Sequence, residues 1–75
     1  MSLHITQNPR RQHERREHAE RAVECFYPAG YRYTVARQCC IAGNLAVLSW
    51  VVKVSNDDGQ FLGYAWDPAE EGELQ

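Results

Sequence analysis

The 75-residue chain has no long apolar run, no secretory leader pattern and little net charge, and each absence removes a class of protein. No apolar stretch approaches the roughly 20 residues that span a bilayer, so we expect no membrane association. The N-terminus lacks the apolar core of a secretory signal, which predicts a cytoplasmic protein. A formal net charge of −2 excludes a global attraction to nucleic acid or anionic lipid.

Cysteine is scarce as well, and its number is odd. Cys39 and Cys40 are neighbours in a predicted strand, where adjacent side chains point to opposite faces of a sheet. Cys25 is the third. A disulfide framework is therefore not expected, and three reduced thiols fit a cytosolic setting.

Sequence motifs for catalysis and cofactor binding are missing. The chain has no glycine-rich phosphate loop and no paired-carboxylate motif, and Ser49 lacks both a nucleophile-elbow sequence and a histidine after it. No sequence motif brings a cysteine close to His13 or His18, so a thiol–imidazole pair would depend on tertiary folding alone. Most cysteines in proteins of this kind are small buried residues. We therefore predict a non-enzymatic protein with no catalytic residue and no cofactor.

The secondary structure expected is one helix followed by three strands. Asn8 is a good N-cap and Pro9 suits the first helical position, while Pro28-Ala29-Gly30 ends a helix, which predicts a helix over residues 8–27. Alternating apolar residues predict strands at 31–41, 45–55 and 60–66.

These elements make a single α+β domain over residues 1–75, with the helix packed on a three-stranded antiparallel β-meander. Residues 1–7 are an arm, either loose or a short edge strand through Leu3 and Ile5. The meander covers residues 31–66, and the acidic tail 67–75 is expected to be frayed.

Two turns set the expected register of the meander. A two-residue Gly43-Asn44 hairpin pairs Cys39 with Leu48, Arg37 with Trp50 and Val35 with Val52. A three-residue loop ending at Gly59 pairs Val54 with Leu62, Val52 with Tyr64 and Trp50 with Trp66. A two-residue Asp58-Gly59 loop is the alternative, and it would turn Phe61, Gly63 and Ala65 toward the core.

The most highly charged stretch is NPRRQHERREHAERAVECF, over residues 8–26. His13 and His18 are five residues apart, about 140° out of alignment on a helix, so the sequence predicts no metal site. Most arginines have a glutamate four residues away, and such pairs weaken phosphate binding. The unpaired edge of Arg11, Arg15 and His18 is the basis of an alternative function, RNA or DNA binding.

The first half of the predicted helix is short of apolar residues, and this deficit directs the main hypothesis. The polar half lies over the end of the sheet that carries Leu48, Trp50 and Trp66, and brings it only Gln12 and Arg15. Large exposed apolar patches mark interaction sites. The predicted partner-binding residues are Arg15, Arg37, Leu48, Trp50 and Trp66, with Arg37 stacking on Trp50.

Three alternatives remain for what covers this end of the sheet. The N-terminal arm closes it and makes both tryptophans core residues, a second copy of the chain forms a homodimer over it, or a different protein binds there. We expect a small protein-interaction or inhibitor module, probed by truncating Trp50 or Trp66.

Two resemblances bear on this hypothesis. SWVVKVSNDDGQFLGYAWDPAEEGEL, over residues 49–74, resembles the end of a PepSY-type repeat in its hairpin glycine and acidic Gly-Glu ending. PepSY modules are typically extracytoplasmic and no export signal is seen here, so the family is not assigned. In size and helix-on-sheet design the chain is similar to small phage-encoded inhibitors, anti-CRISPR proteins included, which implies an accessory protein of a phage or mobile element.

Overall fold

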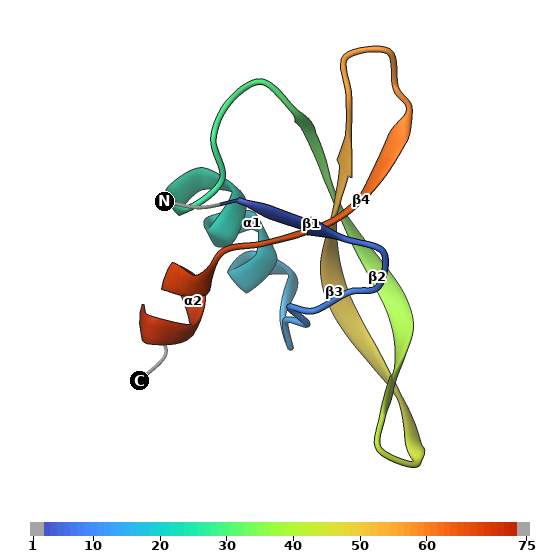
Figure 1. Cartoon of the computed structure of the whole chain (residues 1–75). Coiled ribbons are helices and arrows are strands. Elements are labelled where there is room, and N and C mark those ends of the chain that lie inside the picture. The colour runs from blue at the N-terminus through green and yellow to red at the C-terminus, as the bar shows by residue number, and fades with distance from the viewer. Residues whose placement is uncertain (1–2, 74–75) are drawn as a thin grey trace.

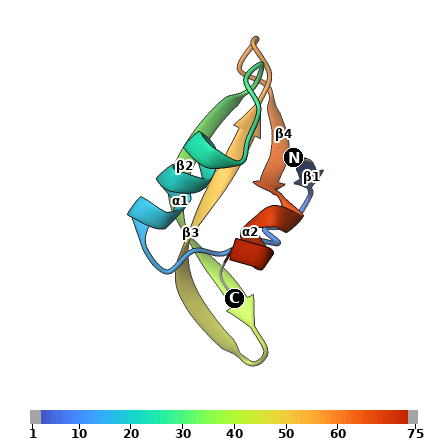
Figure 2. The same cartoon turned by 90° about the vertical axis from the view of Figure 1, so that its left-hand side faces the viewer.

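The computed structural model describes residues 3–73, which form a four-stranded antiparallel sheet with two helices on the same side of it (Figures 1 and 2). The elements in chain order are β1 (His4–Thr6), α1 (Arg16–Cys25), β2 (Arg32–Ala42), β3 (Leu45–Ser55), β4 (Phe61–Trp66) and α2 (Pro68–Glu73). Across the sheet the order is β1-β4-β3-β2. The α+β class is as predicted. Two elements are added to the predicted helix and meander: β1, which precedes α1 and is the fourth strand of the sheet, and α2, which follows β4. Within residues 3–73, neither helix has the length and apolar character that a membrane span requires.

The predicted helix over residues 8–27 is wrong in its first half, because α1 begins only at Arg16. His13 forms an isolated antiparallel bridge with Trp50, and the N–H of each residue donates to the carbonyl of the other at 2.8 Å. Helical backbone at 8–15 would have turned only polar side chains toward the sheet. Extended backbone satisfies the N–H and C=O of Trp50, which β4 leaves unpaired there.

The second half of the predicted helix is confirmed. Ala19 and Ala22 are buried, and Val23 and Phe26 pack beside them, so α1 presents the expected apolar stripe to the sheet. The core cluster consists of Ala19, Ala22, Tyr27, Val52, Val54 and Ala65, with Leu3, Val23, Phe26, Tyr33, Val35, Trp50 and Leu62 packed against it.

The β2–β3 hairpin has the predicted register over its whole length. Cys39 lies opposite Leu48, Arg37 opposite Trp50 and Val35 opposite Val52. At the turn, Gly43 has φ 64° and no other residue of the turn has positive φ. Glycine at the first central position is what a type II′ turn requires, and this turn matches the right-handed twist of the strands.

The β3–β4 hairpin has the predicted loop but not the predicted register. The N–H of Gly59 donates to the Asn56 carbonyl at 3.0 Å, and Gly59 has φ 84°, as expected for a type I turn followed by a left-handed glycine. Beyond it, Ser55 lies opposite Phe61 but Val54 lies opposite Gly63. The extra residue is Leu62, a bulge that the sequence analysis missed.

The bulge reverses the faces of the rest of β4. Gly63 and Ala65 are buried, whereas Tyr64 lies opposite Lys53 and donates its hydroxyl to Gln38 at 3.0 Å. The expected opposition of Val52 with Tyr64 and of Trp50 with Trp66 is therefore wrong. The buried face receives Leu62 from the bulge itself and needs no other large side chain from this part of β4.

β1 is the short edge strand that the arm was expected to contain as one of two alternatives. It pairs with β4 through Ile5 opposite Ala65 and Thr6 opposite Tyr64. Gly63 allows this approach, because a Cβ there would lie 2.6 Å from the Thr6 carbonyl oxygen and 2.7 Å from Ile5 Cγ2.

The expectation of a frayed acidic tail is wrong for residues 68–73, which form α2; residues 74 and 75 lie outside the described part of the chain. The N–H of Ala69 donates to Asp67 Oδ1 at 2.9 Å, and the N–H of Asp67 donates to Glu70 Oε2 at 2.9 Å. This reciprocal pair is a capping box, and Pro68 occupies the first helical position between its partners.

Candidate functional site

The five residues predicted to bind a partner differ in their exposure. Trp50 and Trp66 are partly buried, whereas Arg15, Arg37 and Leu48 are exposed. The ring of Trp66 stacks on His4 at 4.6 Å between centroids, and the guanidinium of Arg10 lies 4.1 Å from its centroid. The N-terminal part of the chain thus contacts Trp66 through His4 and Arg10, whereas the alternative in which the arm closes this end expected Leu3 and Ile5.

Trp50 is covered from the same part of the chain. It packs against the core cluster, and the guanidinium of Arg16 lies 5.8 Å from its ring centroid. Arg37 lies opposite Trp50 in the register, as expected, but the cation over the Trp50 ring comes from Arg16. The two tryptophans are therefore largely occupied by contacts within the chain.

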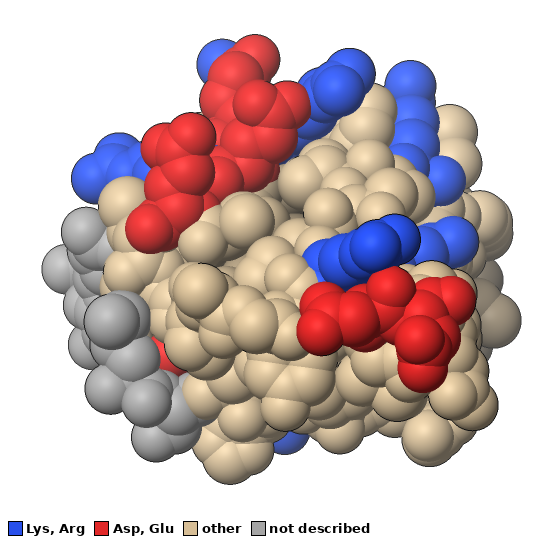
Figure 3. All heavy atoms as spheres, turned by 90° about the horizontal axis from the view of Figure 1, so that it is seen from above, with Lys and Arg blue, Asp and Glu red and all other residues tan. Residues whose placement is uncertain are grey.

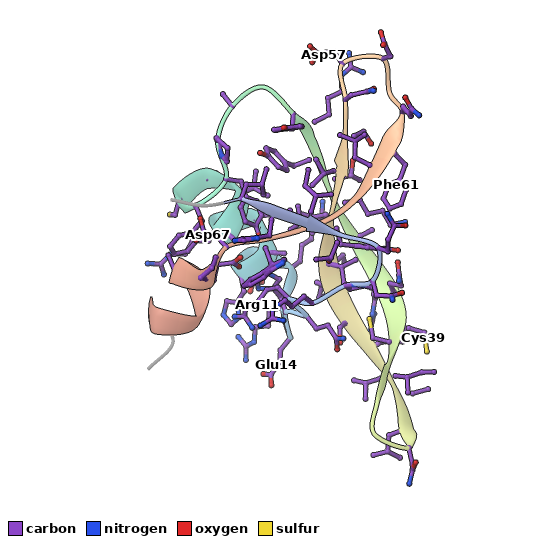
Figure 4. All side chains as sticks on the ribbon, in the orientation of Figure 1. Arg11, Glu14, Cys39, Asp57, Phe61 and Asp67 are labelled. Atoms are coloured by element: carbon purple, nitrogen blue, oxygen red, sulfur yellow. The ribbon has the colours of Figure 1, made fainter. Side chains whose placement is uncertain are left out.

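Most of the large apolar side chains that are exposed among the described residues lie further along the β2–β3 hairpin, in residues 39–48, called here the hairpin end. Four of its large apolar side chains are exposed: Ile41 by 80 %, Leu45 by 70 %, Leu48 by 58 % and Val47 by 42 %. The thiol-bearing Cys39 is exposed beside them and points away from the helices (Figure 4). The sequence of the hairpin end, CCIAGNLAVL, contains no charged residue.

Most of the hairpin end is exposed because, among the described residues, no other strand or helix pairs with it. Only Asn8, Pro9 and Gln12 lie beside it, next to Cys39, Cys40 and Ile41. Pairing between β3 and β4 covers Lys53 to Ser55, and the His13 bridge reaches Trp50. From Trp50 to the turn, the described strands show β2 and β3 paired only with each other, and the hairpin extends past the helices (Figure 1). Both faces of the hairpin end carry apolar side chains, because Ile41 and Leu48 alternate with Leu45 and Val47.

A second feature is a buried polar cluster centred on Glu70 of α2. Glu70 Oε2 accepts hydrogen bonds from the Tyr27 hydroxyl at 2.7 Å and from the Asp67 N–H at 2.9 Å. Glu70 Oε1 faces His13 Nε2 at 3.5 Å and Arg11 Nε at 3.6 Å. These two distances exceed the ordinary hydrogen-bond range of roughly 2.7–3.2 Å, so Oε1 is approached by two groups and bonded by neither.

Burial changes the chemistry of this cluster. The side chains of His13 and Glu70 are each only 3 % exposed. Burial, and then the charges of Arg11 and His18, lower the pKa of His13 to about 4, so its ring is neutral at neutral pH. Burial and the hydrogen bond to Glu70 raise the pKa of Tyr27 far above its ordinary value, which keeps the phenol protonated as a donor.

The cluster opens into a cavity of about 390 Å³ between the segment before α1, α1 itself and α2. Figure 4 places Arg11 between the two helices, close to the start of α2. Six further residues line the cavity with Arg11: His13, His18, Arg21, Ala22, Phe26 and Glu70. Both ring nitrogens of His13, Arg11 Nε and Glu70 Oε1 are buried and have no hydrogen-bond partner among the described residues.

The residues of the nucleic-acid alternative do not form the helical edge that was predicted. Arg11 lies before α1 and faces Glu70, Arg15 is the N-cap residue of α1, and His18 is exposed in its first turns. Figure 3 shows acidic and basic side chains interspersed over the face seen from above, without a continuous basic patch on that face. Binding of RNA or DNA stays a prediction that a gel shift can test.

Metal ligands do not gather either within the described residues, where no group of three or more His, Cys, Asp or Glu side chains is placed to hold an ion. Comparison of the chain with protein-family models, curated proteins and solved structures gave no significant match.

Sequence reasoning missed the acidic member of the cavity because it assigned no structure to the tail. The signal was present in Asp67-Pro68-Ala69-Glu70, which has an N-cap residue, a proline at the first helical position and a glutamate two positions later. Recognising it would have placed Glu70 at a helix start, but not beside His13, because that contact depends on the tertiary packing of α2.

Proposed function

We propose that the protein acts by binding another protein through the hairpin end. The observation that carries this proposal is the concentration of exposed apolar side chains at Ile41, Leu45, Val47 and Leu48, in a stretch without a single charge. A small domain gains nothing in its own folding from apolar side chains left in water. Contiguous exposed apolar surface marks an interaction site.

The position of β2 favours a partner that adds a strand. β2 is the last strand of the sheet order, so its outer edge offers unpaired N–H and C=O groups over an 11-residue strand. A partner strand that pairs with this edge gains backbone hydrogen bonds and, at the same time, contacts the apolar side chains of the hairpin end.

Charge favours an acidic partner over a second copy of the chain. β2 carries Arg32 and Arg37 and no acidic residue. Pairing the β2 edges of two copies would place the arginines of both copies in one interface, and the repulsion between these like charges is unfavourable. A partner strand that is apolar and flanked by carboxylates would contact the apolar side chains of the hairpin end and would also pair with the arginines of β2. Occlusion of such an edge would make the chain an inhibitor of its partner.

Photocrosslinking from inside the hairpin end tests the proposal. A benzophenone amino acid replaces Leu48 in one variant and Phe61 in a matched control, which is also an exposed apolar position but lies on β4. In cells of the organism that encodes the protein, irradiation of the Leu48 variant should produce an adduct that contains a different protein, and the Phe61 variant should not.

A second substitution tests whether the crosslinked adduct depends on the apolar surface of the hairpin end. Ile41→Asp, added to the Leu48 crosslinking variant, should abolish the adduct while circular dichroism shows an unchanged fold. Equal adducts from both crosslinker positions would refute the hairpin end as the docking surface. An adduct of twice the chain's own mass would overturn the heterologous partner in favour of a homodimer.

A further inference from the structure

The cavity between the two helices has features of a ligand site that the hairpin end does not use. Its volume of about 390 Å³ falls within the range of small-molecule pockets. His13 lines it from the segment before α1, with a side chain 3 % exposed and both ring nitrogens unpartnered among the described residues. Arg11 Nε and Glu70 Oε1 are buried and unpartnered in the same way. Native proteins leave few buried polar atoms unpaired, so these atoms indicate where a polar group binds.

The walls of the cavity do not call for a charged ligand. Arg11 and Glu70 form an ion pair, with Nε and Oε1 3.6 Å apart, so their charges offset each other. Arg21 is exposed and takes part in an interaction of its own, so its charge is not available to a ligand. Mainly because of burial, the pKa of His13 is lowered to about 4, and its ring is neutral at neutral pH. A charged ligand would therefore lose its hydration without a net opposite charge to replace it, whereas a neutral polar group loses much less.

The hydrogen-bonding atoms determine which neutral group fits. Glu70 Oε1 is an acceptor, and Arg11 Nε is a donor beside it. His13 Nε2 lies 3.5 Å from the same oxygen, and the carboxylate favours the tautomer with the proton on Nε2, which makes this nitrogen a second donor. A ligand group must therefore accept from two donors and donate to one acceptor. A primary carboxamide does both, because its oxygen has two lone pairs and its NH₂ group donates beside it.

We propose that this cavity binds the neutral carboxamide group of a small apolar molecule. The amide oxygen accepts from Arg11 Nε and His13 Nε2, and the amide N–H donates to Glu70 Oε1. Glu70 is held in place for this role, because its other oxygen accepts from the Tyr27 hydroxyl at 2.7 Å and from the Asp67 N–H at 2.9 Å.

Apolar side chains of α1 and of its C-terminal end provide a wall for the rest of the ligand. Ala22 is buried and Phe26 packs against the core cluster, and both line the same cavity. A flat ring attached to the amide would pack against them, and burial of its apolar surface would favour binding. The simplest molecule with both parts is benzamide.

Titration of the wild-type chain with four probes of nearly the same shape tests the proposal without any variant. Benzamide, benzoate, benzamidine and acetophenone are added separately at about pH 7, where benzoate is an anion and benzamidine a cation, and backbone amide shifts are followed by NMR. Benzamide should bind saturably and shift the signals of residues 11–13 and 67–70. Benzoate and acetophenone cannot donate to Glu70, and the benzamidine cation cannot accept from Arg11, so each should bind at least about tenfold more weakly.

A variant and its control assign the role of Glu70. In Glu70→Gln the side-chain carbonyl can still accept from Tyr27 and the Asp67 N–H, which puts an NH₂ group in the place of Oε1. Benzamide should then bind about tenfold more weakly, and benzoate more tightly than in the wild-type chain, because an acceptor has become a donor and Arg11 has lost its counter-charge. Arg32→Gln, at an exposed position on β2, is the control and should leave all four affinities unchanged.

The outcomes separate the proposal from its alternatives. Equal affinities for the four probes would mean that the apolar wall alone binds them, and tightest binding of benzoate would mean an anion site; either would overturn the proposal. Shifts that never saturate would also overturn it, because the cavity would then hold water alone. If Glu70→Gln fails to fold, the ratio of benzamide to acetophenone affinity in the wild-type chain still decides. None of these results depends on the partner of the hairpin end.

Discussion

His13 makes the stability of the fold depend on pH in a direction that can be worked out. Burial, then Arg11 and His18, lower its pKa from the ordinary 6.5 to about 4 in the folded chain. Between these two values the unfolded chain binds a proton that the folded chain does not bind. Lowering the pH from 6.5 toward 4 therefore favours unfolding, and above pH 6.5 this contribution is constant.

The magnitude follows from the shift. At about 1.4 kcal/mol for each unit of pKa, a shift from 6.5 to about 4 corresponds to a loss of about 3 kcal/mol. A small domain has a free energy of unfolding of roughly 5–15 kcal/mol. Protonation of this one ring therefore accounts for a substantial fraction of the stability.

Urea unfolding, followed by tryptophan fluorescence across the range from about pH 7 to about pH 4, measures the loss. Carboxylates also titrate in this range, so the test is the difference between variants. His13→Gln cannot gain a proton and should lose less stability on acidification than the wild-type chain. His4→Gln, at an exposed position on β1 that is not among the groups shifting the pKa of His13, is the control and should keep the wild-type slope.

An attraction between Glu70 and a protonated His13 would oppose the effect of burial and could refute this prediction. Glu70 Oε1 lies 3.5 Å from His13 Nε2, and an ion pair there would hold the proton in the folded chain. Equal slopes for the wild-type chain and His13→Gln would mean that the attraction to Glu70 offsets the desolvation of the ring. A steeper acid loss for His13→Gln than for wild type would mean that the ion pair dominates.

Three further predictions follow from contacts in the fold. Gly63→Ala should destabilise by about 2 kcal/mol more than Gly30→Ala in urea unfolding, because both glycines have positive φ but only Gly63 has a backbone oxygen of β1 within 2.6 Å of the added Cβ. Tyr27→Phe should cost about 2 kcal/mol, since it removes a buried donor to Glu70, whereas Tyr31→Phe at an exposed ring should change little. A gel shift with RNA or DNA at low salt should show no complex, and a shift with steep salt dependence would support the nucleic-acid alternative instead.

Local signals predicted the hairpins well and the helix boundaries poorly. The β2–β3 register follows from one glycine turn and from the coincidence of two apolar faces, and both are local in sequence. The β3–β4 loop was also predicted, but the bulge at Leu62 was not. The bulge lies next to Gly63, where β1 approaches β4 closely, and this contact joins segments far apart in the chain.

The two Asx-Pro pairs of the chain show why the helix starts were misread. Asn8-Pro9 satisfies the rule for a helix start but is followed by arginine where a capping box has glutamate, and no helix forms there. Asp67-Pro68 is followed by Glu70 at that position, and α2 begins there. The backbone of His13 instead pairs with the edge of β3 at Trp50. This is a tertiary contact, which local helix propensity does not predict.

The predicted docking surface stays a prediction, but the structure changes which of its apolar residues are exposed. The apolar deficit before α1 does leave one end of the sheet uncovered, and Leu48 is exposed there. Arg16 contacts the ring of Trp50, and Arg10 and His4 contact the ring of Trp66. The proposed docking surface is therefore centred nearer to Ile41 and Leu45 than the sequence predicted.

The most direct test of the hairpin end as a docking surface compares affinity with stability in one variant. For Leu48→Asp, the affinity for the crosslinked partner should fall at least about tenfold, as for a residue at the centre of an interface. The free energy of unfolding of the same variant should change by less than about 0.5 kcal/mol, as for an exposed position outside the core. Unchanged affinity together with a large loss of stability would contradict the account, because it would make Leu48 a structural residue and not a contact for a partner.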